Sequence, residues 1–322
     1  MSIESRDTAS FGMGLPPASF LNRPRNLALT ALNRRLLRRP NQILDDLHTA
    51  VPGIPMPGTF ADWGRRADAL VQFTVPSFEY PLSDAPAELH FVGPLSATGS
   101  QAPLPERWSD LDGTRSVIHV TQGTVANTDY GQVIAPTLRA LADDDVLVVV
   151  TTGGRPLDTL PPLPANVRAA TYLPYDELLP RISVYVTNGG NSGVHYALRY
   201  GVPIVATGGK EDKPEVGARI AWSGVGRRIR SEHPSPKALP GTCSPCCISP
   251  ATAGPADAWQ PTLPRLPVWP LGRRRRSVGS GIQSVADCRA VPTAVVTHCL
   301  HGLGFQHGTG VPEKARLGQA IL

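Results

Sequence analysis

One turn of this sequence carries residue types that can bind an anion. An apolar run is joined to a stretch with helical spacing by residues 187–192 (TNGGNS). The two glycines let the backbone approach a ligand closely, and the first N–H groups of a helix point at it with the positive end of the helix dipole. A glycine pair also occurs where a tight turn only needs a positive φ, so this turn alone leaves both interpretations open.

Three further polar segments follow other apolar runs. They are residues 121–124 (TQGT), residues 172–180 (YLPYDELLP) and residues 208–215 (GGKEDKPE). In the last of them, Glu211 and Asp212 could accept hydrogen bonds from the hydroxyls of a ligand. The alternative is that these two acids pair with Lys210 and Lys213 in a solvated loop.

The elements that must position these segments follow a regular pattern. Short β-branched, apolar strands are predicted at residues 116–120, 146–151, 167–171, 184–187 and 204–206, with helical stretches between them. Continuous apolar strands that alternate with helices indicate a parallel sheet covered on both faces. Such a sheet binds ligands at the carboxyl ends of its strands, where the polar segments begin. The sequence therefore predicts an α/β fold with a polar site at one sheet edge.

The residues before the first of these strands are less regular. Residues 20–72 have helical spacing with breaks at Pro and Gly, and the run of Leu and Arg near residues 27–39 reads as a solvated amphipathic helix that Pro40 ends. Extended segments are predicted at residues 71–75 and 88–93.

The order of the four polar segments resembles the donor domain of bacterial GT-B glycosyltransferases, related to those that decorate macrolides, glycopeptides and glycolipids. The resemblance is close over residues 116–237, which it implies form one Rossmann-like, doubly wound parallel sheet. Residues 1–95 resemble a remnant of the N-terminal acceptor domain, and residues 96–115 the linker between the two. The family transfers a hexosyl or deoxyhexosyl group from a UDP- or dTDP-sugar to a hydroxyl of a small-molecule or lipid acceptor. It needs no metal and no further cofactor.

The resemblance also implies a role for individual residues. The donor diphosphate would be held by Gln122, Gly123, Thr124, Asn188, Gly189, Gly190, Asn191 and Ser192. The nucleobase would be held by Leu173, Pro174 and Tyr175, and the sugar hydroxyls by Glu211 and Asp212. Many relatives have His where Asn188 stands. An asparagine can donate a hydrogen bond to a phosphate but brings no positive charge.

No catalytic residue can be assigned from the resemblance. Inverting members use a general base, commonly a His near the start of the acceptor domain, and we expect that segment to lie upstream of Met1. The chain would then transfer sugar slowly or not at all. The alternatives are a non-catalytic nucleotide-sugar-binding module and a non-functional gene fragment. A dinucleotide-dependent oxidoreductase is disfavoured, because the turn after the first strand lacks the Gly-x-Gly-x-x-Gly pattern.

Charge and composition change near residue 238. The net charge is +5, yet residues 1–237 hold equal numbers of basic and acidic residues. Residues 238–322 hold the basic excess, the run Arg273 to Arg276 and all five cysteines. We expect this tail to be disordered or translated out of frame. A zinc site at Cys243 and Cys246 is the disfavoured alternative, because the other Cys and His residues lie too far along the chain.

The same features restrict partners and location. A neutral main part gives no footprint for nucleic acid. The longest strongly apolar run, residues 146–150, is too short for a membrane span, and the N-terminus has no signal-peptide pattern. The sequence therefore predicts a cytoplasmic protein without metal.

Overall fold

The computed structural model describes residues 3–10, 12–17, 20–50, 59, 62–93, 102–239 and 294–296. Its helices are α1 (Arg23–Leu36), α2 (Arg38–Ala50), α3 (Ile134–Ala140), α4 (Tyr175–Leu178), α5 (Asn191–Arg199) and α6 (Lys213–Ser223). Its strands are β1 (Ala69–Gln72), β2 (Leu89–Phe91), β3 (Ser116–Thr121), β4 (Val146–Thr151), β5 (Val167–Ala170), β6 (Val184–Thr187), β7 (Ile204–Ala206), β8 (Gly226–Arg228) and β9 (Ala294–Val296). Seven short 3₁₀ turns, η1 to η7, connect these elements.

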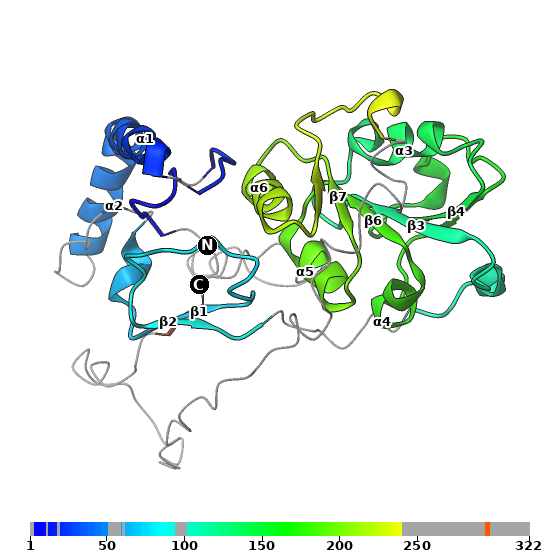
Figure 1. Ribbon diagram of the computed structural model, residues 1–322, viewed down its shortest axis with the longest axis horizontal. Coiled ribbons are helices and arrows are strands. Elements are labelled where there is room, and N and C mark those ends of the chain that lie inside the picture. Colours follow the sequence, from blue (N-terminus) through cyan, green and yellow to red (C-terminus); the bar gives the residue numbers. More distant parts are fainter. Residues whose placement is uncertain are drawn as a thin grey trace, which may run out of the picture.

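The larger sheet has six parallel strands in the order β5-β4-β3-β6-β7-β8 (Figure 1). Chain order runs outward from β3 to β5 and then, on the other side, from β6 to β8, which is the doubly wound Rossmann arrangement. This confirms the predicted α/β fold. The short strand β8 was not predicted, because its sequence Gly-Arg-Arg has neither apolar alternation nor β-branched residues.

The side chains of successive strand residues pack into two separate hydrophobic cores, one on each face of the larger sheet. On β3, Val117 belongs to one core and Ile118 and Val120 to the other. The first core is closed by side chains of α4, α5 and α6 and the second by those of α3. Strands β3, β4, β6 and β7 are almost wholly buried, whereas the edge strands β5 and β8 are only partly buried. Leu239 is fully buried in the second core, so the chain contributes to this unit two residues beyond the predicted boundary at 237.

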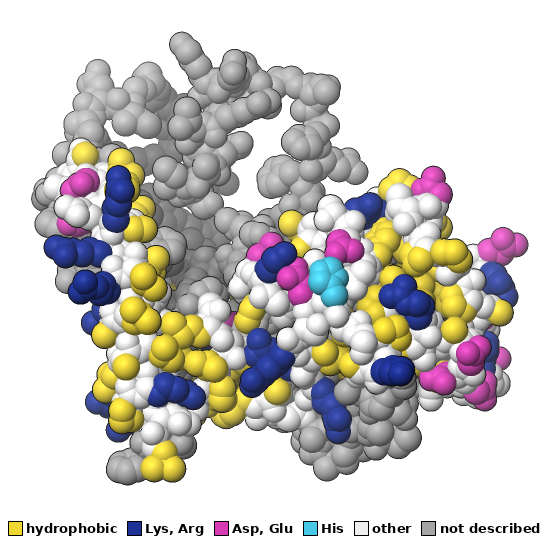
Figure 2. All heavy atoms as spheres, turned by 90° about the horizontal axis from the view of Figure 1, so that it is seen from above, with side chains coloured by type: hydrophobic (Ala, Val, Ile, Leu, Met, Phe, Trp, Pro, Cys, Tyr) yellow, Lys and Arg dark blue, Asp and Glu magenta, His cyan; other side chains and the backbone are white. Residues whose placement is uncertain are grey.

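The smaller sheet has the order β2-β1-β9, with all strands parallel. Strand β9 lies within the predicted tail, whose other residues from 240 onward, including Cys243, Cys246 and the arginine run, lie outside the described residues. Helices α1 and α2 lie beside this sheet (Figure 1). Helix α2 buries none of its side chains, and Figure 2 shows apolar and basic side chains interspersed over the part of the surface that α1 and α2 form.

The prediction that Pro40 ends a helix was wrong. Pro40 is the third residue of α2, which continues to Ala50. In the first turn of a helix a backbone N–H has no partner within the helix, so a proline there removes no hydrogen bond.

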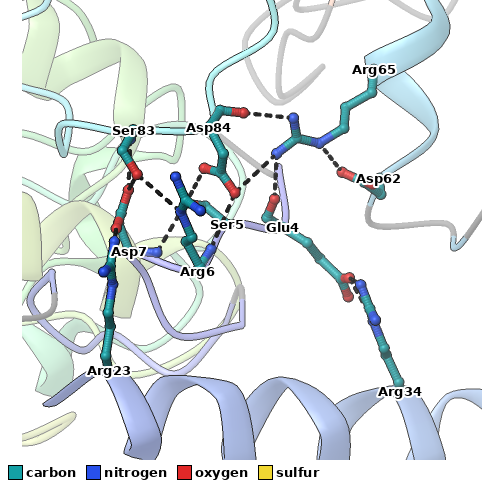
Figure 3. A network of polar contacts seen from close by, with 10 residues as sticks. All are labelled: Glu4, Ser5, Arg6, Asp7, Arg23, Arg34, Asp62, Arg65, Ser83 and Asp84. Carbon is teal, nitrogen blue, oxygen red and sulfur yellow. Dashed lines mark hydrogen bonds and ion pairs between the residues drawn. The ribbon is translucent and has the colours of Figure 1, made fainter.

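A polar network connects residues 4–7 to residues 62–84, which contain strand β1 of the smaller sheet (Figure 3). The carboxylate of Asp7 accepts hydrogen bonds from the N–H and hydroxyl of Ser83, each 2.6 Å, and from Arg23, 3.0 Å. The hydrogen bond from the Ser83 hydroxyl is the main cause that lowers the pKa of Asp7 to about 2. Arg65 donates to the main-chain oxygens of Glu4 and Asp84, both at 2.7 Å.

Buried polar contacts join residues 62–93 to the larger unit. Arg219 on α6 donates to a carboxylate oxygen of Glu79 at 2.8 Å and to Glu215 at 3.0 Å. His195 on α5 and the hydroxyl of Thr74 lie 2.8 Å apart. These side chains are all less than a tenth exposed, so the two parts share a continuous interior.

Candidate functional site

A cavity of about 360 Å³ opens at the carboxyl edge of the larger sheet. It lies between the segments that follow β3 and β6. These two strands pair directly with each other in the middle of the sheet (Figure 1). This is the place where the strand order reverses, and open α/β sheets bind their ligands there. The sheet therefore positions the cavity where a nucleotide site is expected.

Of the predicted site residues, all but Pro174 and Gly189 line this cavity. Those that do so are Gln122, Gly123, Thr124, Leu173, Tyr175, Asn188, Gly190, Asn191, Ser192, Glu211 and Asp212. Pro174 is buried, and Gly189 lies within the turn at φ +90°, a conformation that strongly favours glycine. Four segments far apart in the sequence thus meet at one site.

Helix α5 begins at the floor of the cavity. Its N-cap is Gly190, and no side chain caps the helix. The cavity is lined at this point by Gly190, Asn191, Ser192 and Gly193, the first residues of the helix. The N–H groups of Asn191, Ser192 and Gly193 lie at the positive end of the helix dipole and have no acceptor within the helix, an arrangement that can bind an anion.

Asn188 uses its side chain to tie two turns together. Its amide nitrogen donates to the main-chain oxygens of Gln122 at 2.8 Å and Ala126 at 3.2 Å, and its oxygen accepts from the N–H of Gly190 at 3.3 Å. Both amide hydrogens are therefore committed to protein atoms, and the side chain is almost fully buried. Asn188 shapes the site, and the donors open to a ligand belong to its neighbours.

Gln122 plays a similar part after β3. Its amide nitrogen donates to the main-chain oxygen of Asp129 at 2.8 Å, and its oxygen accepts from the N–H of Ile134 at 3.2 Å. Gly123 and Thr124, in contrast, are exposed to the cavity. The groups of this turn that a ligand would meet are therefore those of Gly123 and Thr124.

Four tyrosines form one wall of the cavity: Tyr172, Tyr175, Tyr185 and Tyr196. The ring of Tyr175 makes edge-to-face contacts with His119, Tyr185 and Tyr196, and burial raises the pKa of its hydroxyl. Tyr172 is 46% exposed, and its hydroxyl donates to the main-chain oxygen of Gly153 at 3.0 Å. Tyr172 therefore presents an anchored, accessible ring. The resemblance implies base stacking on Tyr175 and does not include Tyr172. An aromatic residue directly after the predicted strand at residues 167–171 was the signal that could have indicated Tyr172.

His119 is a core residue on β3. It is fully buried, and its Nδ1 lies 2.9 Å from the main-chain oxygen of Val149. Burial lowers the pKa of its imidazole to about 4. It does not line the cavity, so it is a packed histidine.

The acidic pair stands at the start of α6. Glu211 has a φ of 58°, the one described non-glycine residue with a positive φ, and its carboxylate is paired with the ammonium of Lys213. Lys210 instead pairs with Glu232 at 2.7 Å, outside the cavity lining. The loop-pairing alternative thus describes Glu211, while Asp212 is the N-cap residue of α6 and its side chain makes no capping hydrogen bond.

Much of this chain is similar in sequence to known glycosyltransferases. Residues 135–253 match the family model described as erythromycin biosynthesis protein CIII-like, C-terminal domain. The 4'-demethylrebeccamycin synthase of Lentzea aerocolonigenes is 46% identical over 235 residues, covering 72% of this chain and 55% of that protein. UDP-glycosyltransferase 2 of Phaeomoniella chlamydospora is 36% identical over 237 residues, covering 70% and 52%. Over the matched residues the chain is thus similar to nucleotide-sugar glycosyltransferases.

Solved structures of glycosyltransferases share the fold. The enzyme of kitacinnamycin superposes with a TM-score of 0.54 at 23% identity, over 71% of this chain and 60% of that one. SnogD from Streptomyces nogalater gives 0.50 at 23% identity, over 61% and 54%. The chain spans about half the length of the curated GT-B relatives it matches.

No described helix is both long and apolar enough to cross a bilayer. Among the same residues, no three His, Cys, Asp or Glu side chains are grouped as ligands for a metal ion.

Proposed function

We propose that the cavity binds the nucleoside diphosphate of a UDP- or dTDP-sugar, and that the protein transfers a hexosyl or deoxyhexosyl group from it to a hydroxyl. The observation that supports this most is the uncapped N-terminus of α5 at the point where the strand order reverses. The diphosphate would lie on the N–H groups of Asn191 to Gly193. The nucleobase would stack on Tyr172, within reach of the segment around Leu173 and Tyr175.

The chemistry at this site is electrostatic. When the sugar leaves, negative charge grows on the diphosphate, and groups that favour negative charge before the reaction lower the barrier. The helix dipole of α5 provides such a group without a metal ion. Glu211 and Asp212 stand at the cavity mouth, where they would accept hydrogen bonds from the sugar hydroxyls. The acceptor is a small molecule or lipid that carries a hydroxyl.

The second candidate is a nucleotide-sugar-binding module without catalysis. The lack of a histidine at the cavity favours this candidate. None of the described residues that line the cavity is a histidine, and His119 is buried next to Tyr175. A base for the acceptor hydroxyl would have to come within about 3 Å of it. No described residue is assigned that role.

The two candidates are separated by one set of measurements on the full chain. Calorimetric titration with UDP, dTDP, UMP and NAD should show binding of a diphosphate, weaker binding of the monophosphate and no binding of NAD. Incubation with UDP- and dTDP-sugars and a panel of hydroxylated acceptors then reports on chemistry. Sugar on an acceptor supports the transferase, whereas donor that binds and remains intact supports the binding module. NAD binding without diphosphate binding contradicts both.

A further inference from the structure

The cavity that would hold a diphosphate contains one buried ammonium group. A nucleoside diphosphate brings two or more negative charges, while a helix N-terminus offers about half of one positive charge. Asn188 is neutral and its amide hydrogens are already donated. Among the described lining residues of the cavity, the one cation is Lys213, whose side chain is 8% exposed.

The stem of Lys213 lies against the phosphate-binding turn. A Cβ added to Gly208 would stand 2.5 Å from the Cβ and 2.7 Å from the Cδ of Lys213, and 2.0 Å from the main-chain oxygen of Asn188. One added to Gly189 would stand 3.7 Å from the Cβ of Lys213. The glycines therefore leave room for the lysine to pass directly beside the Asn188-Gly189 turn.

Glu211 holds this ammonium from a strained backbone position. Its φ of 58° lies in the left-handed region, which a residue with a side chain rarely adopts. The strained conformation occurs at the residue whose carboxylate pairs with Lys213, and that carboxylate is half exposed at the cavity mouth. Such a pair is easily exchanged, because the carboxylate can move toward solvent while the buried ammonium cannot.

We propose that Lys213 is the cation that neutralises the donor diphosphate, and that Glu211 is its counter-ion only while the site is empty. Binding of the diphosphate replaces the Glu211 carboxylate at the Lys213 ammonium. The released carboxylate then faces the sugar hydroxyls. No covalent bond is made or broken in this exchange. Lys213 and Glu211 keep their charges, so the charge at the site changes only by that of the bound ligand. The inference rests on the proposed donor site and assigns its charge.

The test compares variants of the full chain by calorimetric titration with UDP or dTDP, whichever the wild type binds, and with the parent nucleoside. Lys213→Met should weaken diphosphate binding on the order of 10- to 100-fold, as expected for loss of a charged hydrogen bond, and leave nucleoside binding unchanged. Lys213→Arg should retain most of the affinity. The matched control is Lys210→Met, which removes an exposed lysine of the same loop and should change neither affinity.

Glu211→Gln provides an independent arm. Because it frees the ammonium, it should tighten binding of the bare diphosphate by roughly two- to fivefold, the value of a partly exposed ion pair. Unchanged affinity in Lys213→Met, or weaker diphosphate binding in Glu211→Gln, would overturn the inference. If Lys213→Met does not fold, the Glu211→Gln result decides by itself. A wild type that binds no diphosphate refutes the proposed function instead, so the two failures are distinct.

Discussion

Among single residues, Asn188 shows how a polar side chain at a binding site can act on the protein and not on the ligand. Its two donated hydrogen bonds hold the turns after β3 and β6 together. Asn188→Ala should cost about 1–3 kcal/mol of unfolding free energy, because it leaves buried carbonyl oxygens without a donor. It should also weaken diphosphate binding, since both turns line the cavity. Urea unfolding and calorimetry measure the two effects.

Asn166 is the matched control for Asn188. Its amide also donates to main-chain oxygens, of Leu141 at 2.8 Å and Val146 at 3.1 Å, but away from the cavity. Asn166→Ala should lower stability and leave binding unchanged. If the two variants bind diphosphate equally well, Asn188 does not organise the site.

The sequence predicted which segments form the cavity but not what each side chain does there. The polar segments could be located because parallel strands bring their carboxyl ends to one edge. Whether Asn188 points at the ligand or at Gln122 depends on the relative height of two turns, which has no local signature. The same holds for Lys213. From the sequence it is a charged residue of a solvated loop, whereas in the fold it is buried.

At the scale of an element, β3 carries a buried ionisable group in the centre of the sheet. His119 has a pKa of about 4 in the folded chain, against an ordinary value of 6.5. Between pH 4 and pH 6.5 the imidazole binds a proton in the unfolded chain but not in the folded chain. The contribution of His119 to the free energy of unfolding is therefore fully present above about pH 6.5 and is lost as pH falls toward 4. The slope is at most about 1.4 kcal/mol per pH unit.

The prediction is that His119→Gln flattens the fall of unfolding free energy between pH 6.5 and 5, as measured by urea unfolding. The lowered pKa values of Asp7 and Glu79, both about 2, affect stability below this window. The exposed His233, changed to Gln, serves as the control and should leave the slope as it is. An equal slope in wild type and His119→Gln would contradict a neutral, buried His119.

The predictability of elements follows their burial. Strands β3, β4, β6 and β7 are predictable because they lie inside the sheet, nearly all of their residues are buried and their sequences are largely apolar. Strand β8, at the sheet edge, is polar and escaped prediction. Pro40 was misread because the sequence does not tell whether a proline ends one helix or stands in the first turn of the next.

At the scale of the whole molecule, Arg219 joins the two parts of the chain. Its guanidinium faces the carboxylates of Glu79 and Glu215 and lies over the ring of Tyr80, 4.5 Å from its centre. Burial by itself would raise the pKa of Glu79, but nearby positive charges, including that of Arg219, hold it at about 2. The ion pair is therefore formed throughout the physiological range.

Arg219→Met should cost about 3–5 kcal/mol of unfolding free energy, because it leaves buried carboxylates without their cation. The ion pair of the exposed Arg107 with Asp110 provides the comparison, and Arg107→Met should cost no more than about 1 kcal/mol because Asp110 keeps its second partner, Arg168. Urea unfolding of both variants measures the difference. Similar costs would mean that the buried network does not hold the two parts together.

The central claim is that the α5 turn binds the diphosphate of a nucleotide sugar, and Gly190→Val tests it most directly. Gly190 has a φ of −60°, and an added Cβ would have no described neighbour nearer than 3.7 Å, so valine should fold there with little change in stability. Its methyl groups would occupy the space above the first N–H groups of α5. Calorimetry with UDP and dTDP should show binding to the wild type and none to a folded Gly190→Val. Equal binding by both proteins would contradict the account.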